Sequence, residues 1–324
     1  MTKPGNKIAI LIPYFGKWPT WFEYFLFSCS HNTSVNWLFF TDCGIPSAGY
    51  ENIRFFDFTL DDFNKIASQQ TGIALNIKYP YKLCDLRPAY GEIFADYIRE
   101  YDFWGYGDID LIYGNLNAYL IDEILENYDI LSNHDQFISG HLCILRNCPE
   151  TVFLYRKEGL YKNIFTDPFY TGFDEQLLKH KLNPEKAHLQ TRMRSHLKRH
   201  MLKVSLYSFL SGMMPPWMKS KLTRSRSTEV KDFTSIVRHY AEIEGIRVLQ
   251  LRTFQSDLML KKMGVEDWQI TWEKGRLTSS HNREGILYFH FILSKLYGSF
   301  STQEFYPGLE SFAITKSGIG IGSV

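Results

Sequence analysis

The chain has 324 residues, of which 44% are hydrophobic and 22% are charged, a balance typical of a folded globular protein. Its net charge of +1 gives no overall attraction to nucleic acid, so we expect no nucleic-acid partner. The five cysteines are irregularly spaced and form no zinc or redox signature, which favours free thiols in a reducing cytosol. The sequence shows no signal peptide and no apolar run of the roughly 20 residues that span a bilayer, so we expect a cytoplasmic protein.

The N-terminal part alternates between strands and helices. Hydrophobic periodicity predicts strands at 7–12, 36–40 and 53–58 and helices at 18–30 and 60–71. A strand, a helix and a second strand in close succession form a βαβ unit, which implies a parallel sheet with a right-handed crossover. The expected fold class is therefore α/β, with a mainly parallel sheet flanked by helices.

The rest of the chain is less regular. Helical segments are predicted at 81–99 around Pro88, 115–127, 149–158, 173–181 and 192–214. Strands are predicted at 101–106, 129–131, 138–146, 247–251, 269–273 and 276–278. The last two flank Lys274-Gly275, which indicates a hairpin.

Two carboxylates stand one residue apart within the aromatic and apolar stretch 103–114. In an extended backbone residues i and i+2 point the same way, so Asp108 and Asp110 would face one point while Ile109 turns into the core. Mg²⁺ and Mn²⁺ prefer such oxygen ligands. A strand that runs into a glycine turn would present the pair at a sheet edge, where α/β proteins bind ligands. We therefore predict a divalent-metal site at Asp108 and Asp110.

This pair resembles the Asp-x-Asp motif of glycosyltransferases with the GT-A fold, where it holds a metal that bridges the diphosphate of a nucleotide sugar. The order of motifs over about the first 180 residues and around His290 is similar to that of bacterial capsule and lipopolysaccharide glycosyltransferases. The resemblance implies a GT-A-like, Rossmann-type fold and Mn²⁺ or Mg²⁺ as cofactor. It also implies transfer of a sugar from a nucleotide sugar, expected to be a UDP-sugar, to a glycan or lipid-linked acceptor.

The resemblance divides the chain into a nucleotide-sugar-binding core at 1–190, a basic helical or flexible insertion at 191–228, and a part at 229–324 that completes the core and the acceptor side. It also assigns donor contacts. The loop after the first strand would contact the nucleotide, and an acid after the second strand would lie against the base or ribose. The cations and acid before the metal motif would meet phosphate or sugar. These predicted donor-binding residues are Pro13, Tyr14, Phe15, Asp42, Lys82, Asp85 and Arg87, together with Asp108.

Simpler interpretations stay open for two of these groups. Asp42 also suits an ordinary turn before Gly44. Lys82, Asp85 and Arg87 also suit an amphipathic helix with a surface ion pair. In the same way, the many aromatic residues are explained either by an aromatic-rich core or by rings that stack on a sugar or a base.

A late histidine lies in the apolar segment 286–296. Several GT-A families use a histidine there as the third metal ligand, followed by a lysine that meets the diphosphate. The resemblance thus assigns His290 to the metal and Lys295 to the donor, since imidazole is compatible with Mn²⁺. A buried core histidine is the alternative for His290. The chain lacks the Lys-Pro-Trp that follows the histidine in those families, since Lys295 is followed by Leu296 and Tyr297.

Asp174 and Glu175 are the predicted catalytic residues. They resemble the acidic pair at a helix start in inverting enzymes, where one carboxylate removes the proton of the acceptor hydroxyl. An ordinary helix cap is the alternative. For transfer of the sugar with retention of configuration no such base would be needed.

The segment from Arg192 to Arg226 is basic: between 191 and 228 there are nine Lys or Arg and no Asp or Glu. A solvated face, contact with anionic lipid at the inner face of the plasma membrane, and RNA binding are all compatible with this composition. The leading prediction for the whole chain is a glycosyltransferase in surface polysaccharide synthesis. The alternatives are a nucleotidyltransferase or phosphotransferase, and a non-catalytic carbohydrate-binding protein.

Overall fold

The structure is a computed structural model and describes residues 5–321 except 48, 179–229, 252–253 and 307. The strands are β1 (Ile8–Tyr14), β2 (Val35–Thr41), β3 (Ile53–Asp57), β4 (Phe103–Gly107), β5 (Leu111–Tyr113), β6 (Ile130–Ser132), β7 (Leu142–Arg146), β8 (Val248–Gln250), β9 (Gln255–Ser256), β10 (Gln269–Glu273), β11 (Arg276–Ser279), β12 (Asn282–Ile286), β13 (Tyr288–His290), β14 (Ser301–Thr302), β15 (Ser311–Thr315) and β16 (Gly318–Gly320). The α-helices are α1 (Phe22–Ser30), α2 (Leu60–Thr71), α3 (Tyr90–Ile93), α4 (Asp122–Asn127), α5 (Pro149–Val152), α6 (Tyr161–Thr166), α10 (Phe233–Glu244) and α11 (Asp257–Lys262). The 3-10 helices are η1 (Pro80–Ala89), η2 (Ala95–Tyr97), η3 (Leu116–Ala118), η4 (Leu154–Arg156) and η5 (Ser294–Leu296).

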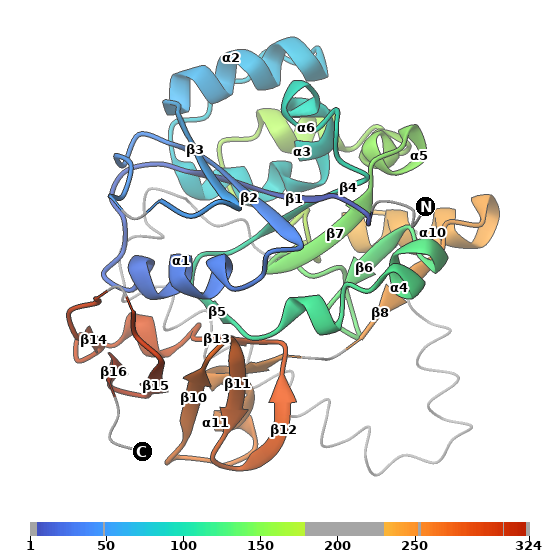
Figure 1. The fold of residues 1–324 in the computed structure, drawn as a ribbon. Helices are drawn as coiled ribbons and strands as arrows, with labels where there is room; N and C mark the ends of the chain where they lie inside the picture. Colours follow the sequence, from blue (N-terminus) through green and yellow to red (C-terminus); the bar gives the residue numbers. More distant parts are fainter. Residues whose placement is uncertain (1–4, 48, 179–229, 252–253, 307, 322–324) are drawn as a thin grey trace.

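Seven strands form the main sheet in the order β3-β2-β1-β4-β7-β6-β8 (Figure 1). All neighbouring pairs are parallel except the two that involve β7, which runs antiparallel to both β4 and β6. The predicted α/β class with a mainly parallel sheet is therefore confirmed. Since β1, β2 and β4 are parallel neighbours, their carboxyl ends meet at one edge of the sheet.

Helices cover both faces of this sheet (Figure 1). Alternate residues of β1 enter two separate cores: Ile8, Ile10 and Ile12 pack on the side of α1, and Ala9 and Leu11 pack on the other side. This alternation is the period of two that a strand buried on both faces requires. The second core lies under α2, α3, α5, α6 and α10.

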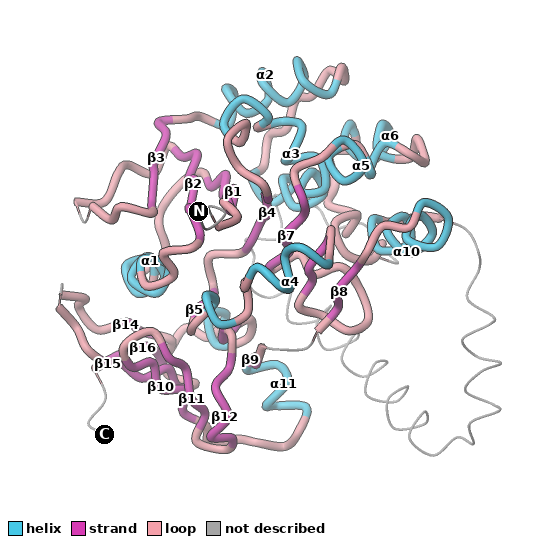
Figure 2. Tube along the Cα trace, turned by 45° about the vertical axis from the view of Figure 1, so that its right-hand side comes forward, coloured by secondary structure: helices cyan, strands magenta, loops and turns pink. Residues whose placement is uncertain are grey.

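Two smaller sheets complete the fold. The chain leaves β4 and enters β5, which pairs with the C-terminal β13, and β13 pairs in parallel with β9. Figures 1 and 2 both place β5 between the main sheet and the C-terminal strands. A six-stranded sheet in the order β12-β11-β10-β15-β16-β14 packs beyond it, against α1. The predicted hairpin is present, with left-handed Lys274 and Gly275 in its turn.

Several predicted helices differ from the structure. The segment predicted as a helix at 173–181 is a turn as far as it is described. Its backbone N–H groups have tertiary acceptors, since Phe173 donates to Asp85 and Leu177 donates to Asp232. The predicted helices at 115–127 and 149–158 are each broken into a 3-10 helix and a short α-helix. The basic insertion at 191–228 and the helix at 192–214 lie outside the described residues.

The prediction missed α10, although its signals are present in the sequence. Asp232 and Ser235 form a capping box at its start, and Gly245 ends it in the left-handed conformation. None of the helices that the structure describes combines the length and the apolarity needed to cross a membrane. The division of the chain into three parts stays a prediction.

Candidate functional site

Asp108 and Asp110 lie in the bend between β4 and β5, so the extended backbone predicted across the pair is not found. Three hydrogen bonds hold this bend. Asp108 N donates to His141 O at 3.2 Å, Trp21 Nε1 donates to Ile109 O at 3.0 Å, and Phe291 N donates to Asp110 O at 3.2 Å. Ile109 is buried as predicted. The bend therefore fixes both carboxylates at the edge where the parallel strands end.

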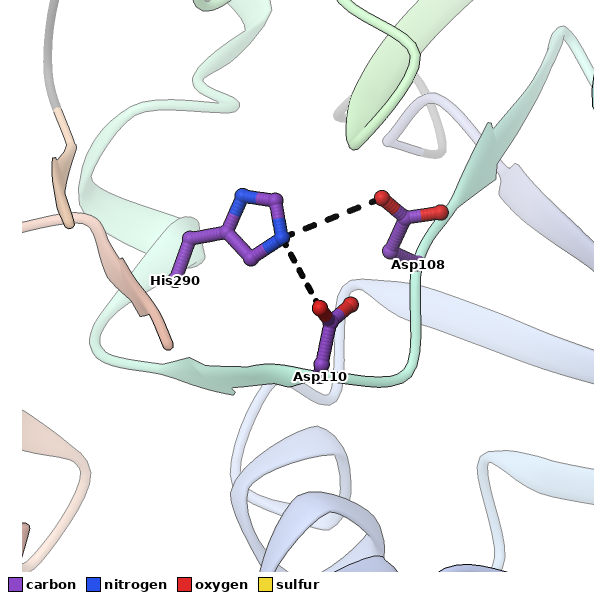
Figure 3. A group of neighbouring side chains, drawn as sticks. All are labelled: Asp108, Asp110 and His290. Atoms are coloured by element: carbon purple, nitrogen blue, oxygen red, sulfur yellow. Dashed lines mark hydrogen bonds and ion pairs between the residues drawn. The ribbon is translucent and has the colours of Figure 1, made fainter. Parts of the chain in front are cut away.

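His290 reaches the same point from the C-terminal part of the chain. Its strand β13 pairs with β5 so that His290 is the register partner of Leu111. Its Nε2 lies 3.1 Å from Asp110 Oδ2 and 3.9 Å from Asp108 Oδ2 (Figure 3). One ligand atom of each residue lies within 4.8 Å of the others, and no second group of this kind occurs in the described part of the chain. The three side chains can therefore converge on one ion.

The chemistry of these donors fits a divalent cation. Two carboxylates and an imidazole suit Mn²⁺ or Mg²⁺, and the half-buried Asp108 leaves one side of the group accessible for a further ligand. His290 Nδ1 is buried and has no hydrogen-bond partner among the residues that the structure describes. A single hydrogen bond of Nε2 to Asp110 thus leaves this buried histidine incompletely satisfied.

Lys295 lies beside this group, in η5, and its ammonium forms an ion pair with Asp110 Oδ2. Burial alone would raise the pKa of Asp110, but the ammonium of Lys295 and the hydrogen-bonded His290 outweigh it and hold this pKa well below its usual range. Asp110 is therefore ionised at neutral pH, which is the state that binds a metal.

Arg87 connects the metal group to a second pair of acids. One of its amino groups forms an ion pair with Asp108, and Nη1 donates to Asp174 Oδ2 at 2.9 Å. Asp174 also accepts from Tyr170 Oη at 3.2 Å. Burial raises the pKa of the Asp174 carboxyl well above its usual range, although Arg87 opposes this. Arg87 thus holds two carboxylates from distant parts of the chain in one place.

Glu175 and Gly140 lie against the Arg87–Asp174 pair. Gly140 N donates to Glu175 Oε1 at 2.7 Å. A Cβ atom on Gly140 would lie 2.7 Å from both Arg87 Nη1 and Asp174 Oδ2 and 2.9 Å from Glu175 Oε1, so any larger residue would displace these charged groups. Burial also raises the pKa of Glu175, against the effect of the Gly140 hydrogen bond. The two acids lie in a turn, so neither the predicted helix start nor a helix cap is found at these residues. Their catalytic role stays a prediction.

The other predicted donor cation has a different environment. Lys82 and Asp85 are fully buried, and their charged atoms lie 2.7 Å apart. The three N–H groups of Lys82 are used by Asp85 and by the carbonyl oxygens of Ile164 and Phe169, at 2.7 to 2.8 Å. Asp85 in turn accepts from Thr171 and Phe173. This pair fixes the 164–173 segment that leads to Asp174, and it is no surface ion pair. Its predicted contact with the donor stays a prediction.

The predicted nucleotide-contacting residues lie at the ends of β1 and β2. Tyr14 stacks on Trp18, and burial, with Cys43 and Asp110, raises its pKa to about 12. The exposed Asp42 accepts from the backbone N–H of Gly16 at 2.7 Å and so closes the loop after β1. Of the others, Pro13 is half-buried at the end of β1, and Phe15 is buried in the core against Phe63.

Three further residues contribute to the site. His141 packs against His290, with ring centroids 5.0 Å apart, and its Nδ1 lies 2.8 Å from Tyr288 Oη. Burial, with the nearby His290, holds the pKa of His141 well below its usual range, so its ring is neutral. Trp21 acts through the hydrogen bond of its indole N–H to the Ile109 carbonyl, and Gly140 acts through the absence of a side chain. No local sequence signal indicates either role.

A family model described as a family of unknown function, DUF6625, matches residues 10–320. No curated protein matches the chain. Among solved structures, the chain is similar to the galactosyltransferase LgtC in complex with donor and acceptor sugar analogs, at 13% identity and a TM-score of 0.30. It is also similar to an active-site mutant of LgtC, at 14% identity and a TM-score of 0.31, and each alignment covers 88% of this chain and 87% of the other. At these scores the likeness supports no conclusion, so the function rests on the chain's own residues.

Proposed function

The chain belongs to DUF6625, a family of unknown function, and we propose that it is a metal-dependent glycosyltransferase of the GT-A type. It would move a sugar from a nucleotide-sugar donor, expected to be a UDP-sugar, to a glycan or lipid-linked acceptor. The observation that carries the proposal is the meeting of Asp108, Asp110 and His290 where β1, β2 and β4 end. Open α/β sheets bind nucleotides at this edge.

Asp108, Asp110 and His290 would hold Mn²⁺ or Mg²⁺, and both ions suit this donor set. When bound, such an ion compensates the charge of the diphosphate leaving group. Asp110 is already ionised, and the bend hydrogen-bonded by Trp21 and His141 keeps its backbone in place. The chain therefore offers a fixed carboxylate pair rather than one that must be assembled.

Lys295 would bind the diphosphate. In the structure its ammonium neutralises Asp110. A cation held by Asp110 would take over that role, and the flexible stem of Lys295 would let the ammonium turn to a phosphate oxygen. Tyr14, Asp42 and Pro13 would form the nucleotide side, at the ends of β1 and β2, and the buried Phe15 would support this loop from the core.

Arg87, Asp174 and Glu175 would form the sugar and acceptor side. Asp174 is held by Arg87 and Tyr170, so it positions the guanidinium. The Glu175 carboxylate accepts a hydrogen bond from Gly140 N alone within the part of the chain that the structure describes. The pKa of Glu175 is raised by burial, which makes its carboxylate a better proton acceptor near neutral pH. Glu175 would therefore take the proton of the acceptor hydroxyl. Lys82 and Asp85 would act indirectly, by fixing the segment that leads to Asp174.

The setting would be surface polysaccharide synthesis in the cytoplasm, at the inner face of the plasma membrane. The basic composition of residues 192–226 supports contact with anionic lipid headgroups there. This part of the proposal rests on composition alone, because these residues lie outside the described ranges.

The first test of the proposal is thermal unfolding with UDP, GDP, CDP and ADP, each with Mn²⁺ and with EDTA. A ligand present at 100 times its dissociation constant stabilises the folded state by about 2.7 kcal/mol. We expect one of the four to raise the melting temperature only when Mn²⁺ is present. No shift with any of them would contradict the proposal.

Product analysis separates the alternatives. A glycosyltransferase releases a nucleoside diphosphate from the matching nucleotide sugar, and a nucleotidyltransferase instead forms or consumes inorganic pyrophosphate. A carbohydrate-binding protein releases neither. We expect Asp110→Ala to abolish release of the nucleoside diphosphate, and an unchanged rate would remove this residue from the reaction.

A further inference from the structure

Lys295 sits on a very short element. The 3-10 helix η5 has three residues, and its N-cap, Leu293, provides no side-chain hydrogen bond. A single turn of this kind leaves its first backbone N–H groups without intrahelical acceptors. Something outside the turn must therefore fix the backbone from which Lys295 extends.

Asp257 supplies that contact. Its buried carboxylate accepts from Leu293 N at 2.9 Å, with a second contact at 3.1 Å, and from Ser294 N at 2.6 Å and Ser294 Oγ at 2.7 Å. Charge-assisted bonds to backbone N–H groups are among the stronger hydrogen bonds in proteins. The carboxylate of Asp257 thus acts as the cap that η5 lacks.

The same carboxylate is tied to the metal group through β9. Ser256, the residue before Asp257, is the register partner of His290 in the parallel pairing of β9 with β13. Ser256 also caps α11 by accepting from Met259 N at 3.2 Å. The two-residue strand β9 therefore pairs with β13 at His290, and Asp257, the next residue in the chain, hydrogen-bonds to the turn that carries Lys295.

We propose that Asp257 is a positioning residue for the diphosphate site. It holds the 293–294 backbone so that the ammonium of Lys295 stays within reach of both Asp110 and a bound diphosphate. This inference rests on the proposed function. Asp257 hydrogen-bonds to the backbone and not to the ammonium of Lys295. The ammonium can therefore turn from Asp110 to the diphosphate without movement of the turn.

The test compares Asp257→Asn with the wild-type chain. Asparagine keeps the size of the side chain but replaces one acceptor oxygen by a donor, which opposes the N–H groups of Leu293 and Ser294. Glu266→Gln is the matched control, because Glu266 lines the same small cavity as Asp257 but is exposed. Calorimetry measures three affinities. The first is that of Mn²⁺ alone. The second and third are measured with Mn²⁺ present, for the nucleoside diphosphate that binds best among UDP, GDP, CDP and ADP and for the corresponding nucleoside monophosphate.

We expect Asp257→Asn to weaken nucleoside diphosphate binding about tenfold, which is the loss of roughly one charge-assisted contact. The monophosphate and Mn²⁺ alone should bind at least as tightly as before, and Glu266→Gln should match the wild type. In a Lys295→Ala background, Asp257→Asn should cause no further loss. Equal losses of all three ligands would indicate general damage and overturn the inference, as would unchanged diphosphate binding.

Ser294→Ala keeps the inference testable if Asp257→Asn does not fold. It removes only the hydroxyl contact to Asp257, and a loss of about threefold for the diphosphate is expected. No loss with this variant would contradict the role of Asp257. If the wild-type chain binds Mn²⁺ but none of the four diphosphates, the proposed function itself fails. If the wild type binds a diphosphate and the variant binds it equally well, only the role of Asp257 fails.

Discussion

Replacing Lys295 by Ala should have opposite effects on the stability of the fold and on metal binding. The ammonium of Lys295 neutralises the buried carboxylate of Asp110. Loss of one partner of a fully buried ion pair costs about 3–5 kcal/mol. The Lys295 side chain is 26% exposed and His290 remains beside Asp110, so a smaller cost of about 2 kcal/mol is expected.

This cost should depend on pH. Lys295 and His290 together hold the pKa of Asp110 below its usual range. Ionised Asp110 therefore stabilises the fold at every pH above the pKa of this residue in the unfolded chain, which is about 3.9. That contribution is lost as pH falls through the folded pKa. The deficit of Lys295→Ala in urea unfolding should therefore be full at pH 7 and shrink below about pH 4.

Metal binding should move the other way. In the wild-type chain a cation competes with Lys295 for Asp110, and the variant removes this competitor. We expect Mn²⁺ alone to bind about tenfold more tightly to Lys295→Ala, and UDP in saturating Mn²⁺ to bind about tenfold more weakly. Lys316→Ala, whose ion pair with Glu266 is exposed, should change none of these quantities. Weaker Mn²⁺ binding by Lys295→Ala would refute the competition between the lysine and the metal.

Three further predictions concern neighbouring residues. Gly140→Ala should cost about 1–3 kcal/mol in urea unfolding, because its Cβ would lie 2.7 Å from Arg87 Nη1, and should abolish sugar transfer while Mn²⁺ still binds; full transfer activity would contradict the close packing. Lys82→Met should lower the free energy of unfolding by about 3–5 kcal/mol, because it leaves Asp85 buried without its cation. A folded variant should still bind Mn²⁺ with wild-type affinity, and a loss of this affinity would contradict a role limited to support of the loop. His141→Gln should flatten the loss of stability between about pH 6.5 and pH 5, because burial lowers the pKa of His141 and the unfolded chain takes up the proton first; an unchanged slope in urea unfolding at these pH values would contradict this origin.

The sequence predicted the parts of the fold that depend on local pattern. The strands β1, β2 and β3 and the helix α2 follow from hydrophobic periodicity and from the cap formed by Thr59, which accepts from Asp62 N in the structure. The spacing of Asp108 and Asp110 likewise indicated that the two carboxylates would share one site. The structure places them in a bend, so the convergence comes from the hydrogen bonds that the Trp21 indole and the His141 carbonyl make to this bend, rather than from strand alternation.

Long-range contacts explain what the sequence did not reveal. His290 meets Asp110 across 180 residues because β13 pairs with β5, and no local pattern specifies that pairing. The turn at Asp174 forms because the N–H of Phe173 donates to Asp85, which lies 88 positions earlier in the chain, and this hydrogen bond competes with a helix. Asp257 looks like an ordinary helix-start acid, and only the fold shows its carboxylate under the turn of Lys295.

The most direct test of this account is a titration of Mn²⁺ followed by electron paramagnetic resonance, on the wild-type chain and on Asp110→Ala and His290→Ala. The account predicts one Mn²⁺ site in the wild type, loss of that site in Asp110→Ala, and at least about tenfold weaker binding in His290→Ala. A folded wild-type chain that binds no Mn²⁺, or a site that survives unchanged in Asp110→Ala, would contradict the central claim that these side chains hold a catalytic metal.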